Sequence, residues 1–162
     1  MNFGLSPKDY LAMVLDAYEE FKANPLSTRH LIAVCTFANH LPEIIIAKYA
    51  QSDPRKVHNH VTGATYRGYA VNLCSEIGIV RDLCDFGKHG PRLDRKSVAV
   101  KETDVKEKLV GDAVGISILG FPIARKIEKI VVTLIDGKEM YADAVVSTVV
   151  DFWKKTFASD NL

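Results

Sequence analysis

The chain has 162 residues, of which 48% are hydrophobic and 25% are charged, values typical of one globular domain with its own core. The formal net charge of +1 excludes nucleic-acid binding through overall charge, so any contact with RNA needs a local patch of cations. The start of the chain, MNFGLSPKDY, has no basic stretch followed by an apolar run. We therefore expect no signal peptide and a cytoplasmic protein.

The three cysteines, Cys35, Cys74 and Cys84, are odd in number and have no CxxC spacing. This usage is typical of thiols packed in a reducing cytosol, and it predicts neither a disulfide nor a zinc site. The apolar stretch LPEIIIAKYA is interrupted by Glu43 and Lys48 and is short for a bilayer. We expect no cofactor and no contact with a membrane.

Start signals for two helices lie in the first fifty residues. Ser6 predicts a helix cap, with Pro7 at the first helical position and Asp9 three residues after the cap. Ser27 predicts the cap of a second helix, whose apolar residues recur at helical spacing as far as Tyr49. Because Pro42 lies inside this second run, we expect a kink or a break there.

The pattern stays helical, but weaker, from Arg55 to about Gly90. Asp53 and Pro54 in QSDPRK predict a further helix start. One helix is predicted through TYRGYAVNLC. Another begins near Ser75 and runs through EIGIVRDLCDFGKH, with these residues directed inward: Ile77, Val80, Leu83 and either Cys84 or Phe86.

The second half of the chain changes to strand-like patterns. SVAVKE alternates, and AVGISIL and KIVVTLI are β-branched runs of strand length. Asp136-Gly137, followed by KEMYA, predicts a β-hairpin. Asp143 predicts the cap of a final helix that packs its apolar face onto the strand 129–135, with these inward residues: Val146, Val149, Val150, Trp153 and Phe157.

The predicted fold class is therefore mainly α. We expect a helical bundle with a small antiparallel β-hairpin or sheet and a closing C-terminal helix. One domain spans 1–162, with a helical body at 6–90, the β element at 97–142 and the closing helix at 143–158.

The candidate site is the segment IVRDLCDFGKHGPRLDRKS. On a helix, Asp82, Asp85 and His89 share one face, and Arg81, Asp85 and Lys88 form the adjacent stripe. The carboxylate of Asp85 would orient His89 and raise its pKa. Arg81 and Lys88 would hold a phosphate by charge-assisted hydrogen bonds.

Two arginines, Arg92 and Arg95, follow in the predicted loop and would extend this phosphate site. A histidine for proton transfer and cations for developing charge are the parts that metal-independent RNA cleavage needs. The same residues also fit a solvated helix face, with His89 stabilised by the helix dipole. Both interpretations stay open.

A helix with Arg, a following polar residue and a downstream His, within a compact helical bundle, resembles the HEPN superfamily. The motif RDLCDFGKH is also similar to a recurring pattern of small bacterial proteins, and DGKEMYADAVVSTVVDFW is similar to their ending. The resemblance implies a ribonuclease of toxin or phage-defence type that acts as a homodimer. It implies that the catalytic residues are Arg81, Asp82, Asp85 and His89, and that Lys88, Arg92 and Arg95 bind phosphate.

The alternative is a non-catalytic module that binds a partner protein or nucleic acid. Seven residues separate Arg81 from His89, whereas the nuclease motif has four to six, and this spacing favours the alternative. Two smaller motifs were weighed as well. His58 and His60 in HNH would point apart on a helix, although a loop could bring both to a metal. In FANH, Asn39 and His40 either are ordinary helix residues or line a pocket facing the Arg81 helix.

Overall fold

A computed structural model describes residues 4–89, 100–110 and 125–162. Along the chain the elements are α1 Pro7–Ala23, α2 Thr28–Tyr49, η1 Pro54–Val57, α3 Gly63–Leu73, α4 Glu76–His89, β1 Val100–Val110, β2 Arg125–Leu134, β3 Glu139–Tyr141 and α5 Ala142–Ser159. This confirms a mainly helical fold with a small antiparallel sheet and a closing C-terminal helix.

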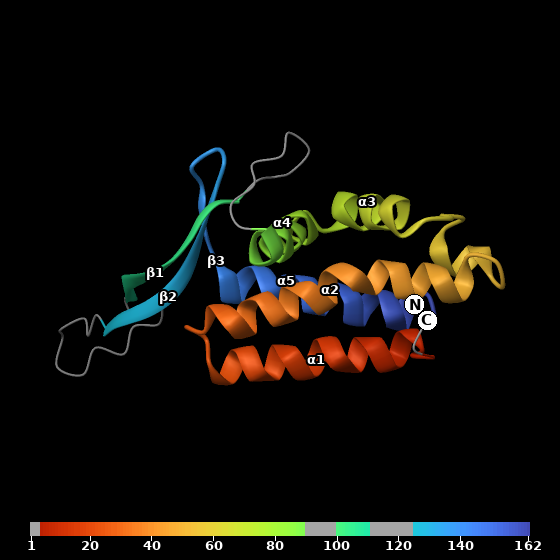
Figure 1. Cartoon of the computed structure of the whole chain (residues 1–162), viewed down its shortest axis with the longest axis horizontal. Coiled ribbons are helices and arrows are strands. Elements are labelled where there is room, and N and C mark those ends of the chain that lie inside the picture. Colours follow the sequence, from red (N-terminus) through yellow and green to blue (C-terminus); the bar gives the residue numbers. More distant parts are fainter. Residues whose placement is uncertain (1–3, 90–99, 111–124) are drawn as a thin grey trace, which may run out of the picture.

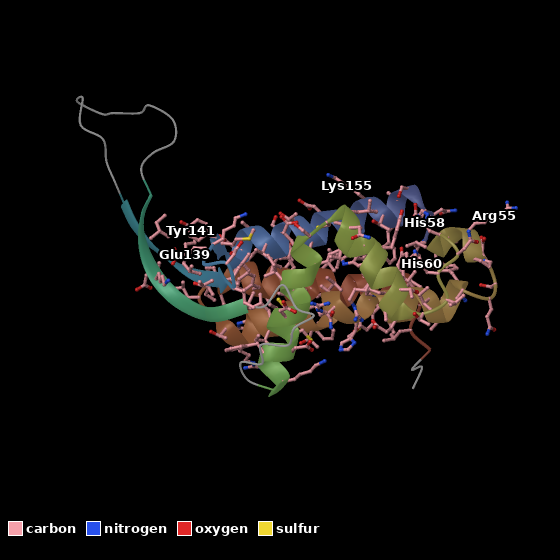
Figure 2. The ribbon with its side chains drawn as sticks, turned by 90° about the horizontal axis from the view of Figure 1, so that it is seen from above. Arg55, His58, His60, Glu139, Tyr141 and Lys155 are labelled. Atoms are coloured by element: carbon pink, nitrogen blue, oxygen red, sulfur yellow. The ribbon has the colours of Figure 1, made fainter. Side chains whose placement is uncertain are left out.

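The helix α2 is the centre of the bundle. It contacts α1, α3, α4, α5 and η1. The helices α1, α2 and α5 run along the long axis, with the sheet at one end and both chain ends at the other (Figure 1). Seen from above, α4 crosses this axis (Figure 2). The polar residues of α4 are therefore carried on a helix that lies across α2.

The first two helices begin as the sequence predicts. Ser6 and Asp9 form a capping box, in which the Ser6 hydroxyl accepts from the Asp9 amide and Asp9 accepts from the Ser6 amide. The Ser6 hydroxyl and the Ser6 amide both donate to the Asp9 carboxylate, and these two hydrogen bonds lower the pKa of Asp9. Ser27 caps α2 by accepting from the amide of His30. Of the kink or break expected at Pro42, the break is wrong, because α2 continues through this residue to Tyr49.

The segment after α2 differs from the prediction. Asp53 makes no side-chain cap, and Pro54–Val57 is only a short 3₁₀ helix. It ends at His58 and Asn59, which both have left-handed backbone, with φ of 49° and 61°. Thr62 then caps α3. The helices α3 and α4 match the two that the sequence predicts for this region.

The sheet has the order β1-β2-β3, and both strand pairs are antiparallel. The β2–β3 hairpin confirms the predicted turn. Gly137 has a φ of 84°, and Asp136 accepts a hydrogen bond from the amide of Lys138. β1 runs well past the SVAVKE segment, to Val110. Ser97–Ala99 and AVGISIL lie outside the described residues.

The closing helix starts slightly earlier than predicted. Tyr141 is its N-cap, and Asp143 lies within the first turn, where it forms an ion pair with Lys129 of β2. The contact between α5 and β2 is confirmed. Trp153, however, lies about three turns along α5. The centroid of its ring is 6.4 Å from the ring centroid of Tyr66 on α3. Trp153 therefore anchors α5 to the helical body.

One apolar cluster joins the helices to the sheet. It includes residues of every helix, together with Ile130, Val132 and Leu134 of β2. All three cysteines are buried, as expected of packed thiols. By length and composition α2 alone among the described helices could cross a membrane, but half of its most apolar window is buried inside the bundle. The expectation of no membrane contact stays a prediction.

Candidate functional site

The predicted site residues of α4 do not share one environment. Asp82 is buried, with 7% of its surface exposed, whereas Asp85 and Lys88 are exposed. His89 is the last residue of α4, and its side chain lies outside the described part of the structure, as do Arg92 and Arg95. Asp82 and Asp85 keep the predicted spacing on one helix, but they are not exposed together, because α4 turns Asp82 toward the core.

Arg81 is held by its neighbour Asp82. Its Nε and Nη2 donate to Asp82 Oδ1 at 3.2 and 3.0 Å. The arginine side chain keeps 28% of its surface exposed, against 5% for the aspartate. The pair lets a carboxylate lie in the core without an isolated charge. Part of the charge of Arg81 is therefore already balanced by Asp82.

Lys88 makes a contact that brings a second histidine into the site. Its Nζ lies 3.0 Å from Nε2 of His40 on α2. Burial lowers the pKa of His40 below its ordinary value of 6.5, and the charge of Lys88 lowers it further, while the charges of Glu43 and then Asp85 act in the opposite direction. A lowered pKa favours the neutral imidazole, whose Nε2 can accept a hydrogen bond from the Lys88 ammonium group.

Asn39 also faces α4. It is 5% exposed, and its Nδ2 lies 3.6 Å from the Cys84 sulfur. Its Oδ1 is buried and has no hydrogen-bond partner within the described residues. Asn39 and His40 both contact α4, so they face the helix that carries Arg81, while the pocket that this alternative expected there stays a prediction.

A close approach of two helices fixes this arrangement. A Cβ built on Gly87 of α4 would lie 2.5 Å from Cγ2 of Ile32 on α2. Only a glycine lets the backbone of α4 come so near. Lys88, the next residue, is thereby placed over His40.

The third helix adds an ion pair beside His40. Arg67 of α3 pairs with Glu43 of α2. Within the described chain, Oε2 of Glu43 and Nε of Arg67 are buried without hydrogen-bond partners. Burial raises the pKa of Tyr10 on α1, and the negative charge of Glu43 raises it further.

These residues define one surface, which we name the α2–α4 polar face: His40, Glu43, Arg67, Asp85 and Lys88. It combines a neutral imidazole with two cations and two carboxylates. Such a set can accept a proton at Nε2 and stabilise negative charge beside it. Sequence analysis assigned Asp85 and Lys88 to the site and raised His40, but the partnership of Glu43 with Arg67 had no signal in the sequence.

The HNH motif forms a separate cluster at the far end of the bundle (Figure 2). His58 and His60 lie in a loop, with ring centroids 4.7 and 5.3 Å from that of Tyr69. His58 Nε2 lies 3.1 Å from a carboxylate oxygen of Asp160. No group of three or more His, Cys, Asp or Glu that could hold a metal occurs in the described ranges.

No protein-family model, curated protein or solved structure matches the chain. The resemblance to the HEPN superfamily therefore stays a prediction. Function has to be inferred from the chain's own residues.

Proposed function

We propose that the α2–α4 polar face binds RNA phosphates, and that the chain is a HEPN-like, metal-independent ribonuclease of toxin or phage-defence type in the cytoplasm. The observation that supports this best is the 3.0 Å contact between Lys88 Nζ and His40 Nε2. It joins a candidate proton acceptor to an exposed cation on the surface of the protein. Arg67 lies in the same set and would add a second positive charge.

The proposed reaction is an attack by the RNA 2′-hydroxyl on the neighbouring phosphorus. His40 Nε2 takes the proton from the 2′-hydroxyl as the new O–P bond forms. Lys88 first leaves Nε2 and follows the phosphate, where it stabilises the developing charge. The P–O5′ bond then breaks, and the leaving oxygen receives a proton from His89.

Cleavage of total RNA by the purified protein in the presence of a chelator tests this proposal. The His40→Ala, Lys88→Ala and His89→Ala variants are each expected to cleave at least 100-fold more slowly. His60→Ala is the matched control, because it removes an imidazole far from the α2–α4 polar face. Cleavage at an equal rate in all four variants would contradict the assigned chemistry.

A second candidate is a non-catalytic module that binds a partner protein or nucleic acid. The pairs Arg81–Asp82 and Arg67–Glu43 favour it, because they occupy the arginines that a nuclease would direct at its substrate. A chain that leaves RNA intact but co-purifies with a stable partner would support this function. If the chain has neither activity nor partner, this second proposal also fails.

We also propose a homodimer, as the HEPN resemblance implies. The apolar stretch LPEIIIAKYA does not supply the surface for such a dimer. Leu41, Ile45 and Ile46 are buried within a single chain. The dimer therefore depends on the resemblance alone, and the surface that it would use is the one carried by α4.

A further inference from the structure

A groove lies between α5 and the corner at which α3 ends and α4 begins. It encloses about 330 Å³, within the range of small-molecule sites, about 300–1,000 Å³. Leu73 and Glu76 line it from the corner, and Asp151, Phe152 and Lys155 line it from α5. Figure 2 shows Lys155 on the surface of α5. We name this site the α3–α5 groove, and it shares no residue with the α2–α4 polar face.

The apolar part of the groove is open to solvent. Leu73, the last residue of α3, is 61% exposed, although its side chain is large and apolar. Phe152 is half-buried, and its ring meets that of Trp153 edge-on, with centroids 5.0 Å apart. A large apolar side chain that entered beside Leu73 and Phe152 would remove the apolar surface of both residues from water, which is favourable.

The charged groups of the groove keep atoms that a ligand can reach. Lys155 makes no ion pair within the described residues. Asp151 approaches Lys154 only at 4.0 Å, and both of these side chains are at least half exposed. Glu76 accepts both of its contacts on Oε2, at 3.3 and 3.5 Å, so Oε1 has no hydrogen bond to the described chain. The groove therefore offers one cation and two carboxylate groups beside an apolar surface.

We propose that the α3–α5 groove binds a free α-amino acid with a large apolar side chain, such as phenylalanine or leucine. Lys155 pairs with the carboxylate of this ligand, and Asp151 and Glu76 pair with its ammonium group. Asp151 and Lys155 are four residues apart on α5 and hence neighbours, so the adjacent charges of an amino acid can bridge them. The ligand's side chain lies between Leu73 and Phe152. A phosphate compound would instead meet two carboxylates that repel it.

The probes are L-phenylalanine and L-leucine, and three analogues each remove one feature of the ligand. Phenylalaninamide lacks the carboxylate, N-acetylphenylalanine lacks the ammonium group, and alanine lacks the large side chain. Trp153, the one tryptophan of the chain, reports occupancy by fluorescence, because its ring centroid lies 5.0 Å from that of Phe152. NMR shifts of the Leu73 methyl groups give a second readout on the unmodified chain.

We expect saturable binding of phenylalanine that is about fivefold tighter than that of each analogue. Lys155→Met should abolish the preference over phenylalaninamide, and Leu73→Ser should weaken the binding of phenylalanine about fivefold. Both residues are exposed, so neither substitution disturbs the core. Lys154→Met is the matched control, because Lys154 lies on the same helix and does not line the groove. It should not weaken binding.

Three results would overturn the proposal: no saturable binding of either amino acid, equal affinity for phenylalanine and its two singly charged analogues, or an equal loss in Lys154→Met and Lys155→Met. This site is independent of the proposed ribonuclease function. The RNA-cleavage assay and the binding assay can therefore fail separately.

Discussion

Asp82 and Asp85 lie one turn apart on α4, in opposite environments. Because Asp82 is buried and carries the Arg81 pair, Asp82→Ala should lower the free energy of unfolding by about 2–4 kcal/mol. Asp85→Ala is the matched control, and it should change that free energy by no more than about 0.5 kcal/mol. Urea denaturation measures both. Equal effects of the two substitutions would contradict the different roles.

The contact between Lys88 and His40 predicts a change in a measurable pKa. Burial is the first cause that lowers the pKa of His40, and the Lys88 charge is the second. Lys88→Met should therefore raise that pKa toward 6.5, which an NMR titration of the imidazole protons measures. Lys22→Met, on α1, should leave it unchanged.

Because folding lowers the pKa of His40, the stability of the folded protein should depend on pH. The folded-state pKa of His40 lies below the unfolded value near 6.5, so the unfolded chain binds the proton more readily. The stabilisation from a neutral His40 is complete above pH 6.5 and is lost as the pH falls through the folded pKa. Lys88→Met should reduce this acid sensitivity.

Part of the candidate site could be predicted from the sequence, because its residues on α4 are close together along the chain. Positions three and four apart on a helix must be neighbours, so Asp85 and Lys88 followed from the motif. The burial of Asp82 could not be predicted, because it depends on which side of α4 meets the bundle. The pairing of His40 with Lys88 joins residues 48 positions apart, and only the packing of α2 against α4 creates it.

At the scale of elements, the approach of α4 to α2 depends on Gly87. An alanine there favours the helix, but its Cβ would meet Ile32 Cγ2 at 2.5 Å. Gly87→Ala should therefore lower the free energy of unfolding by about 1–3 kcal/mol. Gly68→Ala on α3 is the matched control. With no atom within 4 Å of the new Cβ, it should raise stability by up to about 1 kcal/mol.

Thermal or chemical unfolding of both glycine variants decides this point. A stabilised Gly87→Ala protein would show that α4 does not approach α2 as closely as described.

The elements that could be predicted were those with local signals. The capping box at Ser6 and the Asp136-Gly137 turn each depend on residues within four positions of one another. The continuity of α2 through Pro42 could not be predicted, since the packing of its neighbours outweighs the lost hydrogen bond. The length of β1 likewise depends on its partner β2, along which it pairs as far as Val110 with Arg125.

At the scale of the whole molecule, Trp153 connects α5 to the helical body. It is 0% exposed and lies against Tyr66 and Phe152. Trp153→Ala should lower the free energy of unfolding by about 3–5 kcal/mol, as truncation of a buried aromatic does. Trp153→Phe keeps a ring and removes an indole N–H that has no partner in the described chain, so it should cost less. Circular dichroism during denaturation measures both, and an unchanged midpoint for Trp153→Ala would contradict this packing.

The proposed dimer can be assigned to one of two surfaces. β1 is an edge strand, and its sequence KETDVKEK carries charges that oppose pairing with another edge. We therefore expect the dimer to form through the exposed face of α4. Light scattering at micromolar concentration should give about twice the single-chain mass of 18.0 kDa. Asp85→Arg should reduce it to one chain, whereas Asp16→Arg, on the exposed side of α1, should not. A single-chain mass for the unmodified protein would refute the dimer.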